Sequence, residues 1–269
     1  MEKTATDLNK NLLQDCDVFI LAAGLGKRLK EITEKTPKPL VKVCDRELLD
    51  WNLSILKKNG FTNAIINLFY LPQQIKEFIG DGRRWGIDMQ FSEEKILLDT
   101  GGGIKNIENR ISKKYLITLN CDVLLDPNFS FVDLYSSHIN SPNEPYATLV
   151  LREDTNVREY GEILINRQNQ IIKLLESRVS NFATLDKNEL KSMMYTGIQL
   201  ISLKTFSVMP PKGEVFSITQ NTYTSLVNKD CFLNACIYKG FWSDVGTPER
   251  LAQASKEFGE LLKKRLTKN

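Results

Sequence analysis

The stretch LAAGLGKRLKEITEKTPKPL, residues 21–40, combines glycines with cationic side chains directly after an apolar run. Gly24 and Gly26 have no Cβ atom, so their backbone N–H groups can approach an anion closely. Arg28 and Lys38 add positive charge to the same segment. These residue types in this order predict a loop that binds phosphate groups.

Two familiar phosphate-binding loops do not fit this segment. A dinucleotide fingerprint needs a third glycine where Leu29 stands, and a P-loop needs Ser or Thr after its lysine, where Arg28 stands. An oxidoreductase that uses a dinucleotide is excluded by the missing glycine. Taken alone, the glycines could equally form a tight structural turn.

The motif AAGLGKRL, followed by TPKPL, resembles the signature of the sugar-1-phosphate nucleotidyltransferases, also called nucleoside-diphosphate-sugar pyrophosphorylases. Arg28 falls on the phosphate-binding arginine of that family and Lys38 on the lysine of its Pro-Lys-Pro element, while Ala23 replaces the commoner first glycine. The resemblance runs from Val18 to Leu251. It implies two substrates, a nucleoside triphosphate and a sugar 1-phosphate, with attack of a sugar-phosphate oxygen on the α-phosphorus and release of pyrophosphate.

The same resemblance implies a Mg²⁺ cofactor held by Asp122 and Asp244. Mg²⁺ is usually bound by one or two carboxylates together with substrate phosphates. Asp122 follows the apolar run YLITLN, at the strand end where α/β sheets place ligand sites, and Asp244 is expected in a loop of FWSDVGTPERL. Taken alone, either aspartate could be a turn or helix-cap carboxylate.

The predicted catalytic residues are Arg28, Lys38 and Asp122. Arg28 is expected on the β- and γ-phosphates, because a guanidinium binds phosphate oxygens bidentately. Lys38 is expected near the α-phosphate and the sugar phosphate, in a segment that Pro37 and Pro39 make rigid. Lys27 is expected to be solvated.

The resemblance also implies the nucleotide pocket, in which the glycine loop lines the base on one side and a DTGG element closes the other. Asp99 stands where many relatives carry a base-reading glutamine. Its carboxylate could accept from N3–H of uracil or from N1–H and the amino group of guanine, but an exposed loop aspartate is an equal alternative. The predicted nucleotide-binding residues are Ala22, Ala23, Gly24, Gly26, Arg28, Asp99, Thr100, Gly101 and Gly102.

The resemblance defines the sugar-binding residues less clearly than the nucleotide-binding residues. Glu176 is followed by Ser and Arg where the family usually has Lys and Pro, and Cys121 replaces a glycine that is usual between Asn and Asp. These departures leave the identity of the sugar open. The predicted sugar-binding residues are Asn120, Gly161, Glu176, Thr196 and Gly197.

Three segments, LLDTGGGI, LNCDV and FWSDVGTPERL, most resemble family members that use UTP and N-acetylmuramate 1-phosphate in cell-wall recycling. Guanylyl transfer to mannose or heptose 1-phosphate and cytidylyl transfer to phosphocholine are alternatives within the class. A catalytically silent, nucleotide-binding regulatory subunit is the alternative from another class. It is disfavoured because Arg28, Lys38, Asp122 and Asp244 are all present.

The elements that would position these residues alternate between strand and helix patterns. Consecutive apolar residues in VFILAA (18–23) and AIINLF (64–69) predict buried strands, and LLDWNLSILKKNG has helical spacing that stops at Gly60. The alternation predicts an α/β fold with a doubly wound, mostly parallel, Rossmann-like sheet.

The second half of the chain is richer in short strands with turn signals, such as Asn166 and Gly197, which predicts a small antiparallel extension. A terminal helix is expected from Pro248. We expect residues 1–15 to be a polar leader and residues 16–269 to form one nucleotidyltransferase domain without a C-terminal β-helix.

Composition excludes several other classes. A net charge of +3 over 269 residues, with the basic residues spread along the chain, argues against a nucleic-acid partner. No apolar run approaches the roughly 20 residues of a membrane span, and no signal peptide is evident, so a cytoplasmic monomer or homodimer without a membrane partner is expected. The five cysteines are expected to be free, mostly buried thiols, and His138 a helix-face residue without a catalytic or metal-binding role.

Overall fold

The computed structural model describes residues 4–267, which form two compact units. The first unit comprises Leu98–Leu119, Ser130–Lys239 and the described part of Met1–Phe19. The second comprises Ile20–Leu97, Asn120–Phe129 and the described part of Gly240–Asn269. Strand β1 (Cys16–Leu21) begins in the first unit and ends in the second. The single-domain organisation stays a prediction.

The leader expected at residues 1–15 is helical over most of its length, and residues 1–3 lie outside the described range. Helix α1 (Ala5–Asp15) begins with a capping box in which Thr4 Oγ1 accepts from the Asp7 N–H at 3.2 Å and Asp7 Oδ2 accepts from the Thr4 N–H at 3.3 Å. Its last residue, Asp15, accepts a hydrogen bond of 2.6 Å from the Tyr135 hydroxyl. The segment is therefore tied to the first unit.

The first unit is organised around β12 (Lys191–Ser202), which pairs antiparallel with β6 (Tyr115–Asn120) and β8 (Ala147–Arg152). Strand β13 (Leu233–Ile237) pairs in parallel with β8. The prediction of a turn at Gly197 is wrong, since Gly197 has a φ of 82° inside β12, where the register with β8 shifts. A positive φ suits a bulge as well as a turn.

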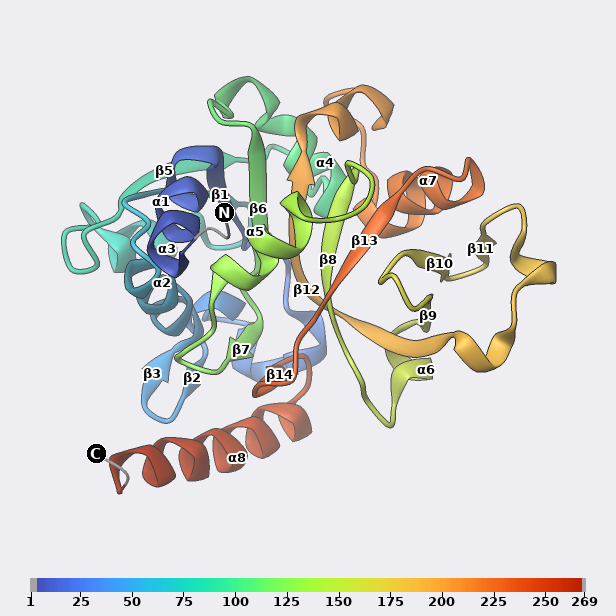
Figure 1. Cartoon of the computed structure of the whole chain (residues 1–269). Coiled ribbons are helices and arrows are strands. Elements are labelled where there is room, and N and C mark those ends of the chain that lie inside the picture. Colours follow the sequence, from blue (N-terminus) through green and yellow to red (C-terminus); the bar gives the residue numbers. More distant parts are fainter. Residues whose placement is uncertain (1–3, 268–269) are drawn as a thin grey trace. The chain divides into compact units, whose positions relative to one another are not determined.

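A second group of short strands in this unit confirms the predicted antiparallel extension. Strand β10 (Ile171–Leu174) pairs antiparallel with β9 (Ile163–Ile165) and β11 (Ser177–Arg178), and β9 also pairs with β12. In Figure 1 these strands lie near α7 (Thr224–Asn228). The other helical elements are α4 (Asp99–Asn106), α5 (Phe131–Ile139), α6 (Val157–Tyr160), a π-helix (Ile218–Tyr223) and 3₁₀ turns at Glu108–Arg110, Phe182–Thr184, Lys187–Glu189 and Leu203–Val208.

His138 confirms its predicted place on a helix, α5, and is buried. Its Nδ1 lies 2.8 Å from Thr148 Oγ1 and its Nε2 lies 3.0 Å from Ser202 Oγ. Burial, with a smaller contribution from the charge of Lys204, lowers the pKa of His138 from 6.5 to about 3. The imidazole is therefore neutral at physiological pH and serves the packing of the first unit.

The second unit contains the parallel pair β4 (Asn63–Leu68) and β5 (Asp88–Glu93) with the helices α2 (Leu48–Lys58) and α3 (Pro72–Ile79). Two antiparallel pairs complete its strands, β2 (Lys42–Val43) with β3 (Arg46–Glu47) and β7 (Val123–Leu125) with β14 (Trp242–Asp244). Asp244 is the last residue of β14, so its expected loop position is wrong.

The long helix α8 (Pro248–Leu266), red in Figure 1, contributes Ala254 and Phe258 to a hydrophobic cluster of the second unit. The Trp51 and Phe258 rings pack edge to face with their centroids 4.9 Å apart, and Arg265 binds both carboxylate oxygens of Asp126 at 2.6 and 2.7 Å. The buried members of the cluster are Leu29, Val41, Val43, Leu48, Leu124, Val245, Ala254 and Phe258. This core fixes the segments that carry Arg28, Asp122 and Asp244.

The observed elements confirm the predicted α/β class, a mixed, mostly parallel sheet with flanking helices and smaller antiparallel sheets.

No helix in the described part of the chain is long and apolar enough to span a bilayer. All five cysteines are free; Cys16 and Cys121 are buried and the other three are partly buried.

Candidate functional site

The loop after β1 begins at a buried polar chain in the second unit. The Ala22 N–H donates to Asn67 Oδ1 at 2.6 Å, and Asn67 Nδ2 donates to Glu94 Oε1 at 2.7 Å. Asn67 and Glu94 are both buried and were not predicted from the sequence. The sequence feature that could have revealed Asn67 and Glu94 is a polar residue at or next to the end of each of the two parallel strands β4 and β5. Of the predicted base-lining groups, the Ala22 N–H is thus engaged within the protein.

The two glycines of the loop differ in what they require. Gly26 has a φ of 65°, and a Cβ there would lie 3.0 Å from Thr33 Cγ2 and 3.3 Å from Lys38 Cβ, so the fold itself needs a glycine. Thr33 Oγ1 also donates to the Gly26 carbonyl at 2.9 Å. Gly24 is exposed, and a Cβ there would meet no described atom within 4 Å. The backbone at Gly24 is therefore open to a ligand.

The chain after Gly26 forms a 3₁₀ helix (Lys27–Thr33). Arg28 and Lys27 are exposed on it, as expected for Lys27. A second 3₁₀ turn (Lys38–Leu40) carries Lys38, which is 8% exposed between two buried prolines. Lys38 Nζ lies 2.6 Å from Asp122 Oδ2, so the structure pairs two of the predicted catalytic residues.

Asp122 lies in a turn between β6 and β7 that the backbone holds on both sides. The Cys121 N–H donates to the Leu21 carbonyl at 2.9 Å, and the Val245 N–H donates to the Asp122 carbonyl at 3.0 Å. The Cys121 side chain is buried, and burial together with the charge of Asp122 raises the pKa of its thiol. The cysteine therefore stays protonated and inert at neutral pH.

Asp244 is opposite Val123 in the β14–β7 pair, one position along from Asp122. Arg250 Nη1 donates to Asp244 Oδ2 at 2.6 Å. A Cβ on Gly246 would lie 2.8 and 2.9 Å from the two Asp244 carboxylate oxygens and 3.1 Å from Arg28 Nη2. The carboxylate and the guanidinium thus both lie against Gly246, a residue that the sequence reading did not single out.

These side chains fit a Mg²⁺ ion of the kind that the family resemblance implies. Asp122, in the turn before β7, and Asp244, at the end of β14, supply carboxylate oxygens, and each has a cationic partner at 2.6 Å. Within residues 4–267 there is no group of three or more His, Cys, Asp or Glu side chains that could hold a metal ion. Two carboxylates without a third ligand suit an ion that is also held by substrate phosphates.

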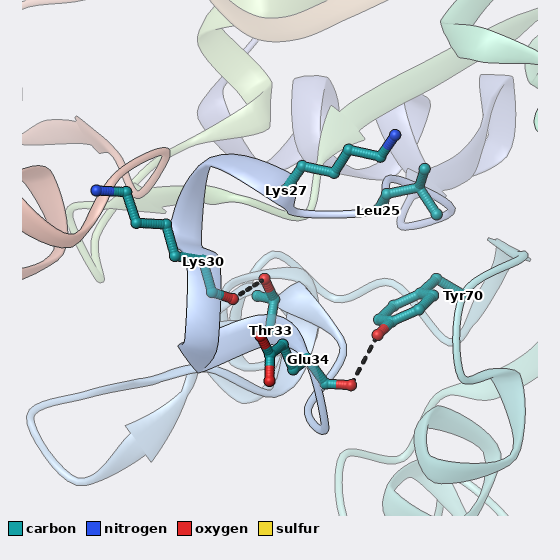
Figure 2. Close-up of a pocket in the computed structure, with 6 residues that line it drawn as sticks. All are labelled: Leu25, Lys27, Lys30, Thr33, Glu34 and Tyr70. Atoms are coloured by element: carbon teal, nitrogen blue, oxygen red, sulfur yellow. Dashed lines mark hydrogen bonds between the residues drawn. The ribbon is translucent and has the colours of Figure 1, made fainter.

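A cavity of about 330 Å³ lies beside the glycine loop, lined by Leu25, Lys27, Lys30, Thr33, Glu34 and Tyr70. Figure 2 shows the Tyr70 hydroxyl donating to the Glu34 carbonyl, at 2.9 Å, and the side chains of Lys27 and Lys30 pointing in opposite directions. The two ammonium groups do not converge, so this cavity is not by itself a phosphate site.

In the first unit, the DTGG element packs against residues 214–218. The Gly101 and Gly102 N–H groups donate to the Phe216 carbonyl at 2.9 and 3.1 Å, and Thr100 Oγ1 accepts from the Ile218 N–H at 3.1 Å. A Cβ on Gly101 would lie 2.3 Å from the Phe216 ring, and one on Gly102 would lie 2.5 Å from the Glu214 carbonyl oxygen. Packing alone thus requires both glycines. Asp99 is exposed, has a φ of 62°, and accepts from the Thr100 N–H at 2.5 Å.

The predicted sugar-binding residues of the first unit are held mainly by backbone shape. Gly161 has a φ of 87° and approaches Leu175, while the neighbouring Glu176 is exposed. Thr196 is buried and its hydroxyl donates to the Val150 carbonyl at 2.8 Å. Asn120, the last residue of β6, is partly buried and belongs to the second unit.

Comparison with known proteins supports the likeness seen in the sequence. The family model described as Nucleotidyl transferase matches residues 18–260. N-acetylmuramate alpha-1-phosphate uridylyltransferase of Neisseria meningitidis serogroup B is 36% identical over 153 residues, which cover 52% of this chain and 66% of that protein. D-glycero-alpha-D-manno-heptose 1-phosphate guanylyltransferase of Campylobacter jejuni is 28% identical over 233 residues, which cover 86% of this chain and 95% of that protein.

The fold is shared with solved structures. The crystal structure of HddC from Yersinia pseudotuberculosis complexed with GMP-PN is similar with a TM-score of 0.70 at 24% identity, covering 90% of this chain and 99% of that chain. The chain spans slightly less than two thirds of some relatives it matches, 66% of the Neisseria protein and 61% of a mannose-1-phosphate guanyltransferase from Gibberella zeae.

Proposed function

The chain belongs to the nucleotidyl transferase family, and from this premise we propose that it transfers a nucleotidyl group from a nucleoside triphosphate to a sugar 1-phosphate. In that reaction an oxygen of the sugar phosphate forms a bond to the α-phosphorus, and the bond from the α-phosphorus to the bridging oxygen breaks. Pyrophosphate leaves and a nucleotide sugar forms. Both substrates are anions, so catalysis consists mainly of positioning and electrostatic stabilisation.

The observation that carries this proposal is the ion pair between Lys38 and Asp122, 2.6 Å long and mostly buried. Lys38 would stabilise the negative charge that develops around the α-phosphorus. Buried between two prolines, it is held in place, so little reorganisation is needed when the substrates react.

Arg28 would bind the β- and γ-phosphates of the nucleotide. Its guanidinium is exposed and lies against Gly246, beside the Asp244 carboxylate. The open backbone at Gly24 would let phosphate oxygens approach the loop N–H groups.

Asp122 and Asp244 would hold Mg²⁺ together with the substrate phosphates. When bound, the ion would supply positive charge that offsets the negative charge of the phosphates. In the chain alone, Lys38 and Arg250 offset the charges of these two carboxylates. Without those cations, two nearby carboxylates would repel one another.

We propose UTP and N-acetylmuramate 1-phosphate as the substrate pair, with a role in cell-wall recycling. The 36% identity to the Neisseria uridylyltransferase supports this pair, although the match covers 52% of the chain. Guanylyl transfer to heptose 1-phosphate is the second candidate, because the Campylobacter relative matches over 86% of the chain. The exposed Asp99 is proposed to read the base in either case.

A panel of pyrophosphate-release assays with Mg²⁺ tests the proposal. ATP, GTP, CTP, UTP and dTTP are each paired with N-acetylmuramate, N-acetylglucosamine, mannose, glucose and heptose 1-phosphates, and CTP also with phosphocholine. Release only with UTP and N-acetylmuramate 1-phosphate would support the full proposal, and another active pair would replace the substrates while keeping the reaction. No release from any pair would contradict the transferase activity and favour a silent regulatory subunit.

A further inference from the structure

We infer from the contacts of helix α2 that Asn52 is a positioning residue, which holds the turn that carries Asp122 and so sets where that carboxylate lies. Asn52 is 1% exposed, and neither the sequence motifs nor the proposed chemistry assigns it a role. The structural claim stands on the contacts of Asn52 alone, while its consequence for turnover rests on the proposed function.

The contacts of Asn52 bracket the aspartate. Asn52 Nδ2 donates to the Cys121 carbonyl at 3.2 Å and to the Val123 carbonyl at 3.3 Å, the residues immediately before and after Asp122. The same nitrogen donates to the Leu48 carbonyl, one helical turn back on α2, at 3.1 Å. One amide group thus joins the helix to both sides of the turn.

The orientation of this amide is set by its surroundings. Three carbonyl oxygens surround Nδ2, so the opposite orientation would place Oδ1 against them and repel it. Within the described part of the chain, Oδ1 accepts no hydrogen bond although it is buried. A buried acceptor without a hydrogen-bond partner costs free energy, so an apolar side chain would suit the packing of α2 better than asparagine does. Its N–H groups are what this position requires.

The helix that carries Asn52 is itself firmly held. Asp50, two residues earlier and 1% exposed, accepts from Trp85 Nε1 at 2.7 Å and from Arg84 Nη2 at 2.9 Å. The turn is also bonded through backbone groups to Leu21 and Val245. Asn52 is the side chain that completes this support, and it acts on the proposed metal ligand as outer-shell partners do, by fixing its orientation.

Asn59, the residue that directly follows the last residue of α2, offers a matched control. Asn59 Nδ2 donates to the carbonyl one turn back, that of Ile55, at 2.9 Å and to the Phe129 carbonyl at 2.9 Å. Both asparagines therefore join α2 to the segment Asn120–Phe129, one beside Asp122 and the other at the far end of the segment. A difference between them isolates the effect on the aspartate turn from a general loss of stability.

The experiment compares the full-length wild type with Asn52→Leu and Asn59→Leu, which remove the amide and nearly keep the side-chain volume. Hydrogen exchange at the Val245 amide, read by NMR, reports on the turn because this N–H donates to the Asp122 carbonyl. We expect exchange to speed up about tenfold or more in Asn52→Leu and to stay within about twofold of wild type in Asn59→Leu.

A second readout follows turnover. The Mg²⁺ concentration at half-maximal rate should rise about tenfold in Asn52→Leu, in the range seen when an outer-shell partner of a metal ligand is lost, and stay near wild type in Asn59→Leu. If Asn52→Leu does not fold, Asn52→Ala replaces it in both measurements.

The outcomes separate the two proposals. Unchanged exchange at Val245 in a folded Asn52 variant, or equal acceleration in Asn59→Leu, would overturn the positioning role whatever the turnover. Accelerated exchange confined to the Asn52 variant would support it, even if the wild type released no pyrophosphate from any substrate pair and the proposed function had failed.

Discussion

In the second unit, charged side chains contact one another, whereas in the first unit half of the predicted nucleotide- and sugar-binding residues are glycines, and Gly101, Gly102 and Gly161 lie against other parts of the protein. Lys38 pairs with Asp122 and Arg250 with Asp244, each at 2.6 Å. By contrast, Gly101 is fixed by the Phe216 ring and carbonyl. In the second unit, the paired lysine, arginine and aspartate side chains could give up these partners to bind phosphates and a metal ion. In the first unit, the glycines serve the close packing of the backbone.

This difference explains why the reaction class is easier to infer than the substrates. Lys38 and Asp122 are paired and also stand in the sequence motifs of the family, and this combination favours phosphate and metal chemistry over a purely structural ion pair such as that of Asp126 and Arg265. A glycine with a positive φ, such as Gly161 or Gly197, suits any tight backbone, with or without a sugar nearby. Substitutions should therefore affect turnover in the second unit and stability in the first.

The largest effect is expected from Lys38→Met, compared with Lys27→Met. Removal of the buried ammonium should lower kcat by at least about a hundredfold, the scale of losing one electrostatic stabiliser. Lys27 is exposed, so Lys27→Met should change kcat by less than about threefold. Steady-state kinetics on the folded proteins measures both kcat values. Equal effects of the two substitutions would contradict the special role expected of the buried lysine.

The next effect is expected from Gly246→Ala. The new Cβ would lie 2.8 and 2.9 Å from the Asp244 carboxylate oxygens and 3.1 Å from Arg28 Nη2, so the carboxylate must move, and both groups can move at little cost to stability because they are the ends of side chains. We expect kcat to fall about ten- to a hundredfold with little change in Tm. Gly259→Ala, within α8, is the control, since among the described residues its Cβ would meet only Cys44 Sγ, at 3.6 Å. That variant should keep its activity and gain about 0.5–1 kcal/mol in stability.

In the first unit, Gly101→Ala should act on stability. Its Cβ would lie 2.3 Å from the Phe216 ring and 2.9 Å from the Ile218 nitrogen, so the chain must shift. We expect a loss of about 1–3 kcal/mol in the free energy of unfolding, measured by urea denaturation. A variant as stable as wild type would show that this contact is not needed for packing.

A further effect concerns pH. His138 has a native pKa lowered from 6.5 to about 3, so the unfolded chain binds a proton in this range and the native chain does not. The contribution of the neutral imidazole is present above pH 6.5 and is lost as the pH falls toward 3, by up to ~1.4 kcal/mol per pH unit. His138→Gln should flatten this part of the stability profile. An unchanged slope in urea titrations at pH 7 and pH 5 would contradict the assignment.

Much of the fold could be predicted because its signals are local. Buried strands such as β4 appear as mostly apolar runs, α2 ends two residues before Gly60, and α3 ends directly before Gly80. Strand β14, in contrast, exists because it pairs with β7, more than a hundred residues away in the chain, and three residues carry no periodic pattern. Helix α1 was read as a leader although Thr4 and Asp7 form a capping signal.

The site was predictable only in part for the same reason. Lys38, Asp122 and Asp244 stand in motifs, and the fold brings the first two into contact. Asn52 and Asn67 stand in none, because their partners lie on distant segments. The sequence also does not reveal that the Ala22 N–H donates its hydrogen bond to Asn67 Oδ1.

The central claim is that Asp122 and Asp244 together form the reaction centre, and pyrophosphate release by Asp122→Ala and Asp244→Ala tests it most directly. Asp126→Ala is the control, because Asp126 lies in the same segment as Asp122 and is paired with Arg265 on α8. We predict that each site variant loses at least about a hundredfold in turnover while Asp126→Ala keeps most of it. Wild-type rates in a folded Asp122→Ala or Asp244→Ala protein would contradict the account.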